Sequence, residues 1–182
     1  ERKVQACAQD TLRVGGLAAH TLPLRVRALY NSAYPLNVNT GAVWAGAGVS
    51  TVLEAGAGIR IGPLRAAFYP TVAWQQNADF PTRTVDLEGF SPDIYPGHAG
   101  VIDWPQRHGD AAFWTLHPGQ SAVWIEAFGA AAGVSTENLW IGSAQRTPLM
   151  LSNTAPGFAH VFLGTAQPVR TPIGSFEAQT FW

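Results

Sequence analysis

Apolar and polar residues alternate along much of the chain with a period of two, which is the spacing of a β-strand. In the stretch LPLRVRALY, one face would carry Leu22, Leu24, Val26, Ala28 and Tyr30. The other face would carry Pro23, Arg25 and Arg27, until Leu29 interrupts the pattern. A strand with large apolar side chains on one side and arginines on the other contacts two different environments.

Further strand patterns follow at short intervals. Residues 49–61 and 64–76 flank Gly62-Pro63, which predicts an antiparallel hairpin. Within the second of these, Pro70 predicts a bulge or an edge position. The small residues at 55–58 predict a close approach of backbones or rings. Later strands are predicted at 111–116, 121–134, 148–152, 159–165 and 175–182, with a turn at 117–119.

Helix signals are nearly absent. Gly or Pro recurs every few residues, and each destabilises a helix interior by about 1 to 3 kcal/mol. No apolar run reaches the roughly 18 residues of a membrane-spanning helix. Residues 81–110 are rich in Pro and Gly and predict a long irregular loop, and Phe90, Tyr95 and Trp104 favour an ordered one. We expect residues 1–182 to form a single domain.

Composition narrows the fold class. Charged residues make up 13% of the chain, against about 25% in an average soluble domain, and 47% are hydrophobic. Roughly eight to ten strands are predicted, many of them near the roughly 9 to 11 residues that cross a bilayer. These features favour an all-β fold, an antiparallel transmembrane-type β-barrel. A soluble β-sandwich has the same periodicity and is the alternative.

The balance of charges excludes several partners and cofactors. The net charge is -1 and Lys3 is the single lysine, so we predict no nucleic-acid partner. Cys7 is the single cysteine, which rules out an internal disulfide. The five histidines are isolated in sequence, and no metal site is predicted. The stretch GAGIRIG misses the dinucleotide-binding spacing by one residue, so we predict no cofactor.

Catalytic patterns are weak, and we do not expect an enzyme. No G-x-S-x-G motif is present. Glycoside hydrolysis needs two carboxylates, for which Glu126 and Glu137 are candidates. The simpler interpretation of Glu126 is a lumen or surface residue, or the partner of an arginine. A glycan-acting enzyme that uses Glu126 or Glu137 stays as an alternative.

Two neighbouring blocks carry a family resemblance. The first is STENLWIG, residues 135–142, and the second is LMLSNTAPGFAHVFLGT, residues 149–165. Together they resemble the capsule assembly protein Wzi family, whose blocks read like S-T-E-N-x-W-W-G-P and S-N-N-A-P-G-F-P-H. PVRTPIGSFE, residues 168–177, is similar to that family's next strand pair, and IDWPQRHG, residues 102–109, to a segment upstream. The chain departs from the family pattern at Ile141, Ser143, Thr154 and Ala159.

The resemblance implies binding to polysaccharide. Members of this family are outer-membrane β-barrels that act as lectins and fix capsular or extracellular polysaccharide to the bacterial cell surface. The implied partners are therefore that polysaccharide and outer-membrane lipid, and the implied location is the bacterial outer membrane. The residues placed at a glycan site or in a polar network of the lumen are Ser135, Thr136, Glu137, Asn138, Trp140, Asn153, Pro156, Gly157 and His160. The alternative role of this cluster is an internal network that stiffens the barrel wall.

Family members are larger barrels and tend to carry a helical plug, for which this sequence shows no matching helix. We therefore expect part of a barrel, an open arc of about eight to ten strands. Its first and last strands should not pair. A small closed barrel, with the strand at 22–30 bonded to the strand at 175–182, is the alternative. A transport or structural barrel without glycan specificity is a further functional alternative.

Overall fold

The computed structural model describes residues 9–80, 108–142, 144, 148 and 150–182. These residues form strands and no helix, so the expected all-β class is confirmed. No helix in the described part of the chain is long and apolar enough to cross a membrane. Most of the loop predicted at 81–110, and most of the segment 102–109, lie outside the described residues.

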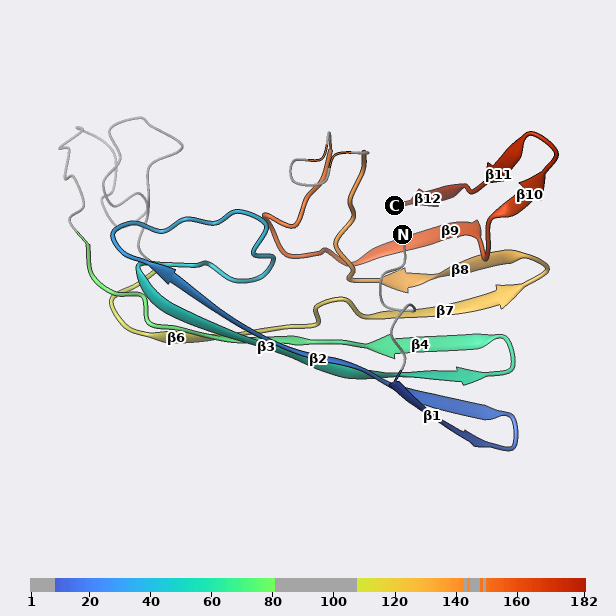
Figure 1. Cartoon of the computed structure of the whole chain (residues 1–182), viewed down its shortest axis with the longest axis horizontal. Coiled ribbons are helices and arrows are strands. Elements are labelled where there is room, and N and C mark those ends of the chain that lie inside the picture. The colour runs from blue at the N-terminus through green and yellow to red at the C-terminus, as the bar shows by residue number, and fades with distance from the viewer. Residues whose placement is uncertain (1–8, 81–107, 143, 145–147, 149) are drawn as a thin grey trace.

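One antiparallel sheet makes up most of the fold (Figure 1). Its strands are β1 (Gln9–Val14), β2 (Leu17–Asn31), β3 (Gly48–Ile61), β4 (Leu64–Phe68), β5 (Thr71–Gln75), β6 (Phe113–His117), β7 (Ala122–Ala127), β8 (Ala130–Ser135), β9 (His160–Thr165) and β12 (Gln179–Phe181). The order across the sheet is β1-β2-β3-β4-β7-β8-β9-β12. In addition, β5 pairs with β3, and β6 pairs with β5. A separate hairpin joins β10 (Val169–Thr171) to β11 (Gly174–Phe176).

The chain crosses the sheet twice in a crossing that is interrupted once, so that β4 and β5 form one such pass and β6 and β7 form the next. Both β4 and β5 pair with β3, and both β6 and β7 pair with the pass that β4 and β5 form. The first interruption falls at Tyr69 and Pro70, where proline has no N–H to donate. Pro70 is not at an edge of the sheet, and the register with β3 is the same on both sides of it, so the predicted bulge or edge position is not found against β3. The second lies opposite, at 118–121. The turn predicted at 117–119 does not reverse the chain. β6 and β7 run in the same direction, because both are antiparallel to the pass formed by β4 and β5.

Several strand boundaries differ from the prediction. The hairpin around Gly62-Pro63 is confirmed, and residues 121–134 form the hairpin β7–β8. Of the strand predicted at 148–152, the described residues 148 and 150–152 form none, and Met150 makes only an isolated bridge with Ile141. The strand predicted at 175–182 is divided between β11 and β12. Residues 168–177, likened to a strand pair, do hold the hairpin β10–β11.

A β-bulge in β2 corrects the facing of one predicted residue. The register shifts between Leu22, opposite Gly56, and Arg25, opposite Glu54. Two residues of β2 therefore oppose one of β3, and alternation resumes one position late. Leu22 is 5% exposed, whereas Leu24 is 66% exposed on the other face. The simple alternation predicted that Leu22 shares a face with Leu24, Val26, Ala28 and Tyr30. This prediction is wrong for Leu22, which lies on the inner side of the sheet.

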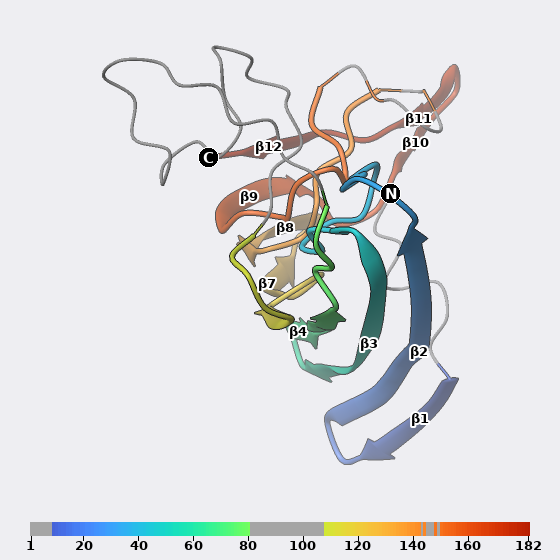
Figure 2. The ribbon, with the colours of Figure 1, turned by 90° about the vertical axis from the view of Figure 1, so that its left-hand side faces the viewer.

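The two faces of the sheet differ sharply in burial. We call inner the face that holds the main buried cluster, formed by Leu22, Ala67, Tyr69, Ala122, Trp124, Ala131 and Phe162. In Figure 2 the strands follow an arc that opens toward the loop segments on this side. We call the opposite side the outer face. Its exposed large side chains are Leu12, Val14, Leu17, Leu24, Val26, Tyr30, Leu53, Ile59, Ile61, Leu64, Phe68, Trp114, Leu116, Val123, Ile125, Val134, Val161 and Leu163.

The sheet is open. Among the described strands, β2 pairs only with β1 and β3, and β12 pairs only with β9. The expectation that the first and last strands do not pair is therefore met within the described residues. The small closed barrel, in which β2 would be bonded to the strand at 175–182, is not what they form.

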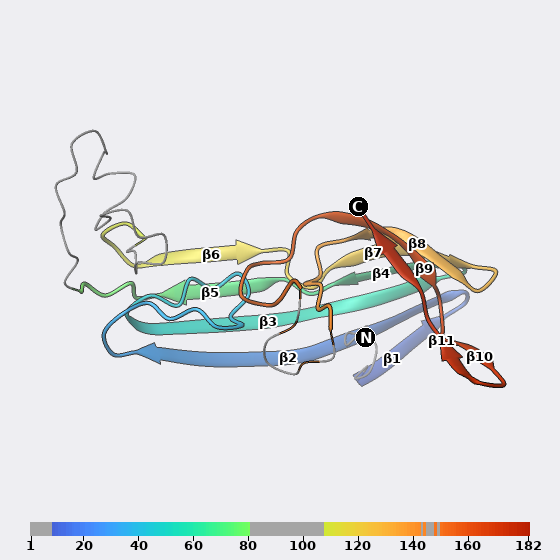
Figure 3. The same cartoon turned by 90° about the horizontal axis from the view of Figure 1, so that it is seen from above.

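The connections at the two ends of the sheet differ in length. Short turns join β1 to β2, β3 to β4 and β7 to β8 at one end, on the right of Figures 1 and 3. At the other end, longer segments join β2 to β3, β5 to β6 and β8 to β9. These three long connections leave the sheet from one end. The connection from β9 to β12, residues 166–178, holds the β10–β11 hairpin and leaves from the end with the short turns.

Candidate functional site

The connection from β2 to β3, residues 32–47, folds back over the inner face. Val43 and Ala45 are buried there against Val52 and Ala73. Gln75 is fully buried, and its Oε1 accepts the Ala45 backbone N–H at 3.0 Å. This segment closes the inner face at the end of the sheet that carries the long connections.

The first block of the predicted site begins where β8 ends. Ser135 is 4% exposed, and its Oγ accepts the Glu137 backbone N–H at 2.9 Å. The same hydroxyl lies 3.3 Å from Glu137 Oε2, which accepts its hydrogen. Thr136 donates from Oγ1 to the Gly119 carbonyl at 2.9 Å. These hydrogen bonds fix the chain where it leaves β8.

Asn138 joins the two predicted blocks. Its Nδ2 donates to the Ala155 carbonyl at 2.7 Å and to the Ser152 carbonyl at 3.4 Å. Its Oδ1 accepts from Gln120 Nε2 at 2.7 Å. A Cβ at Gly157 would collide with the Thr136 carbonyl oxygen, so only glycine allows this close approach of the backbones. The structure therefore brings residues 135–138 against residues 152–157, and Asn138 is engaged within the protein.

The remaining predicted residues occupy different surroundings. His160 lies opposite Ser135 at the start of β9 and is 4% exposed, with Nδ1 2.8 Å from the Phe158 carbonyl oxygen. The Asn153 carbonyl accepts the Gly41 N–H at 2.6 Å, which links the two connections. Trp140 donates from Nε1 to the Ala144 carbonyl at 2.9 Å. Buried His160 thus supports the fold and is not on open surface.

Pro156 lines two pockets. One, of about 270 Å³, lies within the connection from β8 to β9. The other, of about 580 Å³, lies between residues 154–156, the connection from β2 to β3, and β6. Its rings include Trp44, His108 and Phe113, with ring centres 6.0 Å apart for Trp44–His108 and 4.4 Å for His108–Phe113. We call it the aromatic pocket.

Trp44 was not among the predicted site residues. Its indole Nε1 is buried and has no hydrogen-bond partner among the described residues. A buried donor without a partner is costly, so the position is suited to an acceptor brought by a ligand. Its signal in the sequence was only an isolated tryptophan in a glycine-rich stretch, which does not distinguish a binding residue from a core residue.

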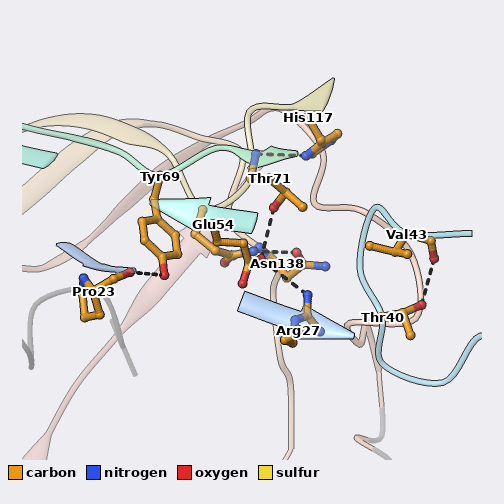
Figure 4. A network of polar contacts seen from close by, with 11 residues as sticks. Pro23, Arg27, Thr40, Val43, Glu54, Tyr69, Thr71, His117 and Asn138 are labelled. Atoms are coloured by element: carbon orange, nitrogen blue, oxygen red, sulfur yellow. Dashed lines mark hydrogen bonds and ion pairs between the residues drawn. The ribbon is translucent and has the colours of Figure 1, made fainter. Parts of the chain in front are cut away.

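Charged side chains on the strands gather on the inner face. Arg25, Glu54, Thr71 and His117 lie directly opposite one another across β2, β3, β5 and β6. Arg27 Nη2 lies 3.6 Å from Glu54 Oε1, which also accepts from Thr71 Oγ1 at 3.2 Å (Figure 4). Nearby, Tyr69 donates to the Pro23 carbonyl at 2.7 Å.

A second ion pair lies nearer the short turns. Arg65 Nη2 is 3.3 Å from Glu126 Oε2, and Trp124 Nε1 donates to Glu126 Oε1 at 2.8 Å. Glu126 is thus the partner of an arginine, which was the simpler interpretation of the sequence. It lies opposite Ala131, and Ser135 is four residues farther along β8, about 13 Å at the rise of a strand. Glu137 lies beyond that, whereas the two carboxylates of a glycosidase are about 5 to 9.5 Å apart.

The described residues hold no group of three or more His, Cys, Asp or Glu side chains that could bind a metal ion. Comparison with protein-family models, with curated proteins and with solved structures gave no match to this chain. The resemblance to the Wzi family therefore stays a prediction from the two sequence blocks.

Proposed function

We propose that this chain forms the wall of a bacterial outer-membrane β-barrel whose outer face lies in lipid. The supporting observation is the outer face itself. Eighteen large apolar side chains are at least 38% exposed on one side of a single sheet, and no described element covers them. In water, a patch of this kind would drive association or aggregation. In a bilayer, the same side chains contact hydrocarbon.

The lengths of the connections support an orientation. Outer-membrane barrels have short turns on the periplasmic side and longer loops outside the cell. By this rule the turns at Gly15-Gly16, Gly62-Pro63 and Phe128-Gly129 would be periplasmic, and three of the four long connections would lie outside. The fourth, from β9 to β12, would share the periplasmic end. The aromatic pocket and the blocks joined by Asn138 would then lie toward the cell exterior.

We further propose that the exterior end of the inner face binds capsular or extracellular polysaccharide and helps to hold it at the cell surface. Flat aromatic rings pack against the C–H faces of sugars, and the aromatic pocket offers three of them. Its volume suits about one to a few sugar rings, on the scale of known ligand pockets of about 300 to 1,000 Å³. The family resemblance of the neighbouring blocks points to the same ligand class.

The membrane part of the proposal is tested by the requirement for an amphiphile. The protein should be soluble and rich in strands only in detergent or lipid. A stable monomer in plain buffer would overturn it.

The glycan part is tested with a panel of capsular polysaccharides immobilised on beads. Trp44→Ala should weaken retention of the protein, whereas Trp182→Ala, which truncates an exposed tryptophan at 69% exposure, should not. A conducting channel in planar bilayers that no polysaccharide blocks would favour the transport alternative.

A further inference from the structure

Five of the six described arginines lie on the inner face of neighbouring strands. Arg25 and Arg27 belong to β2 and alternate with the outward Val26. Arg60 of β3 is directly opposite Arg65 of β4, and Arg60 is also opposite Ala18 of β2. Ala18 is in turn opposite Arg13 of β1, so Arg13, Arg60 and Arg65 share one row. The sixth, Arg170, is exposed on the β10–β11 hairpin, outside the main sheet.

Carboxylates on the same face do not balance these charges. Among the described strand side chains the inner face holds Glu54 and Glu126, paired with Arg27 and Arg65. On the strands, five positive charges less two negative charges leave an excess of three. Glu137, just beyond β8, bonds to the inward Ser135 and would reduce the excess to two. Arg13, Arg25 and Arg60 make no hydrogen bond or ion pair with a described residue, although Arg25 lies directly opposite Glu54. The chain as a whole has a net charge of -1, so this excess is local.

The arrangement has an energetic cost within the protein. Like charges directly opposite on neighbouring strands repel one another, and Arg60 faces Arg65 in this way. The Arg27 Nε atom is buried with no hydrogen-bond partner among the described residues. An anion bound along the inner face would relieve both costs. Guanidinium groups suit this role, because their planar donors match carboxylate and phosphate oxygens in pairs.

We infer that the inner face binds an anionic glycan, one whose sugars carry carboxylate or phosphate groups. The inference rests on the proposed function and adds the substrate class. Arg27 lies on the same row as Thr115, which lines the aromatic pocket, three strands or about 14 Å away. A glycan seated in the pocket would therefore reach the arginines within a few sugar units. Uncharged rings would contact the pocket, and acid groups would contact the arginines.

The test compares acidic glycans with their neutral counterparts on the full chain in detergent. The probes are polygalacturonate and its carboxyl-reduced form, and a phosphomannan and its dephosphorylated form. At least one acidic probe should bind at least about tenfold more tightly than its neutral form, because charge-assisted hydrogen bonds would be lost. Affinity for that probe should fall as salt is raised.

Variants locate the effect. Arg25→Gln and Arg60→Gln should each weaken binding of the acidic probe by about tenfold and leave any binding of its neutral form unchanged. Arg170→Gln removes the same charge outside the sheet and should change neither. Both inner-face arginines are exposed and have no described partner, so strand content by circular dichroism should be preserved.

The outcomes separate the two proposals. Equal binding of acidic and neutral forms would overturn the anionic substrate class and keep polysaccharide binding. Equal loss in Arg170→Gln and in the inner-face variants would also overturn it, because the effect would then be one of overall charge. Failure of every polysaccharide, neutral or acidic, to bind would overturn the proposed function itself.

Discussion

The outer and inner faces belong to the same strands but have opposite chemistry. Along β3, the outward Leu53, Ile59 and Ile61 are exposed without a covering layer, whereas the inward Ser50, Val52 and Glu54 have partners or are buried. In a β-sandwich the apolar face would be the covered one, because two sheets bury their apolar faces against each other. Here the covered face carries the arginines and the docked connections. Water is therefore the better solvent for the inner face, and lipid for the outer face.

Leu22 and Leu24 offer the largest contrast, because the bulge puts two identical residues on opposite faces. Leu22→Ala should lower the free energy of unfolding by about 2 to 5 kcal/mol, since it opens a cavity beside Tyr69 and Trp124. Leu24→Ala removes a side chain that is 66% exposed and should cost less than about 1 kcal/mol. Urea titration of the protein in detergent micelles measures both. Equal costs for the two variants would show that the bulge does not place Leu22 and Leu24 on opposite faces of the sheet.

A charge on the outer face should be nearly as costly. Val123→Arg, in the middle strands of the sheet, should destabilise the protein in lipid vesicles by about 2 to 4 kcal/mol, because arginine would enter hydrocarbon. Ile173→Arg adds the same charge at a side chain that is 99% exposed in the β10–β11 turn. This control should have little effect. A neutral result for Val123→Arg would mean that water reaches this face.

The hydrogen bonds of Asn138, which join the two predicted blocks, should contribute less to the free energy of unfolding. Asn138→Ala removes bonds to the Ala155 carbonyl and to Gln120, and should cost about 1 to 3 kcal/mol by leaving these groups without partners. Thr154→Ala, at an exposed neighbour, should be near neutral. Chemical unfolding monitored by tryptophan fluorescence compares the two variants. If Asn138→Ala abolished glycan retention and left stability unchanged, Asn138 would be a ligand contact and not a structural residue.

The smallest effect is expected at the ion pair near the short turns. Glu126→Gln retains an oxygen that can accept from Trp124 Nε1 but removes the charge opposite Arg65. The expected cost is about 1 kcal/mol or less. A loss of turnover on a glycan substrate in this variant, with binding retained, would instead revive the hydrolase alternative.

Local patterns in the sequence predicted the strands well and their facing less well. The period-two alternation and the Gly62-Pro63 turn located β2, β3 and β4, because each signal acts over a few residues. The bulge after Leu22 depends on pairing with β3, which alternation within one strand does not reveal. The segment around Met150 is apolar enough for a strand, but among the described residues it makes only a single bridge to Ile141.

The candidate site was predicted in part for the same reason. The two blocks around Asn138 and Gly157 were recognised as residue patterns, and they do lie together. Their contacts are largely internal, which the sequence had left open as a stiffening network. The row formed by Arg13, Arg60 and Arg65 was not foreseen, since it arises from strand register across β1 to β4.

Accessibility to small probes along β3 tests the central claim most directly. Cys7 would be replaced by serine, and positions 51, 53, 54, 55, 57 and 60 would be replaced in turn by cysteine and spin-labelled in lipid vesicles. Our account predicts that oxygen, which concentrates in hydrocarbon, relaxes the outward labels at 51, 53, 55 and 57 most strongly. A water-soluble nickel chelate should relax those at the inward positions 54 and 60, which are not buried in the core. Uniform access of the nickel chelate to both sets, or alternation with the opposite phase, would contradict the assignment of the outer face to lipid.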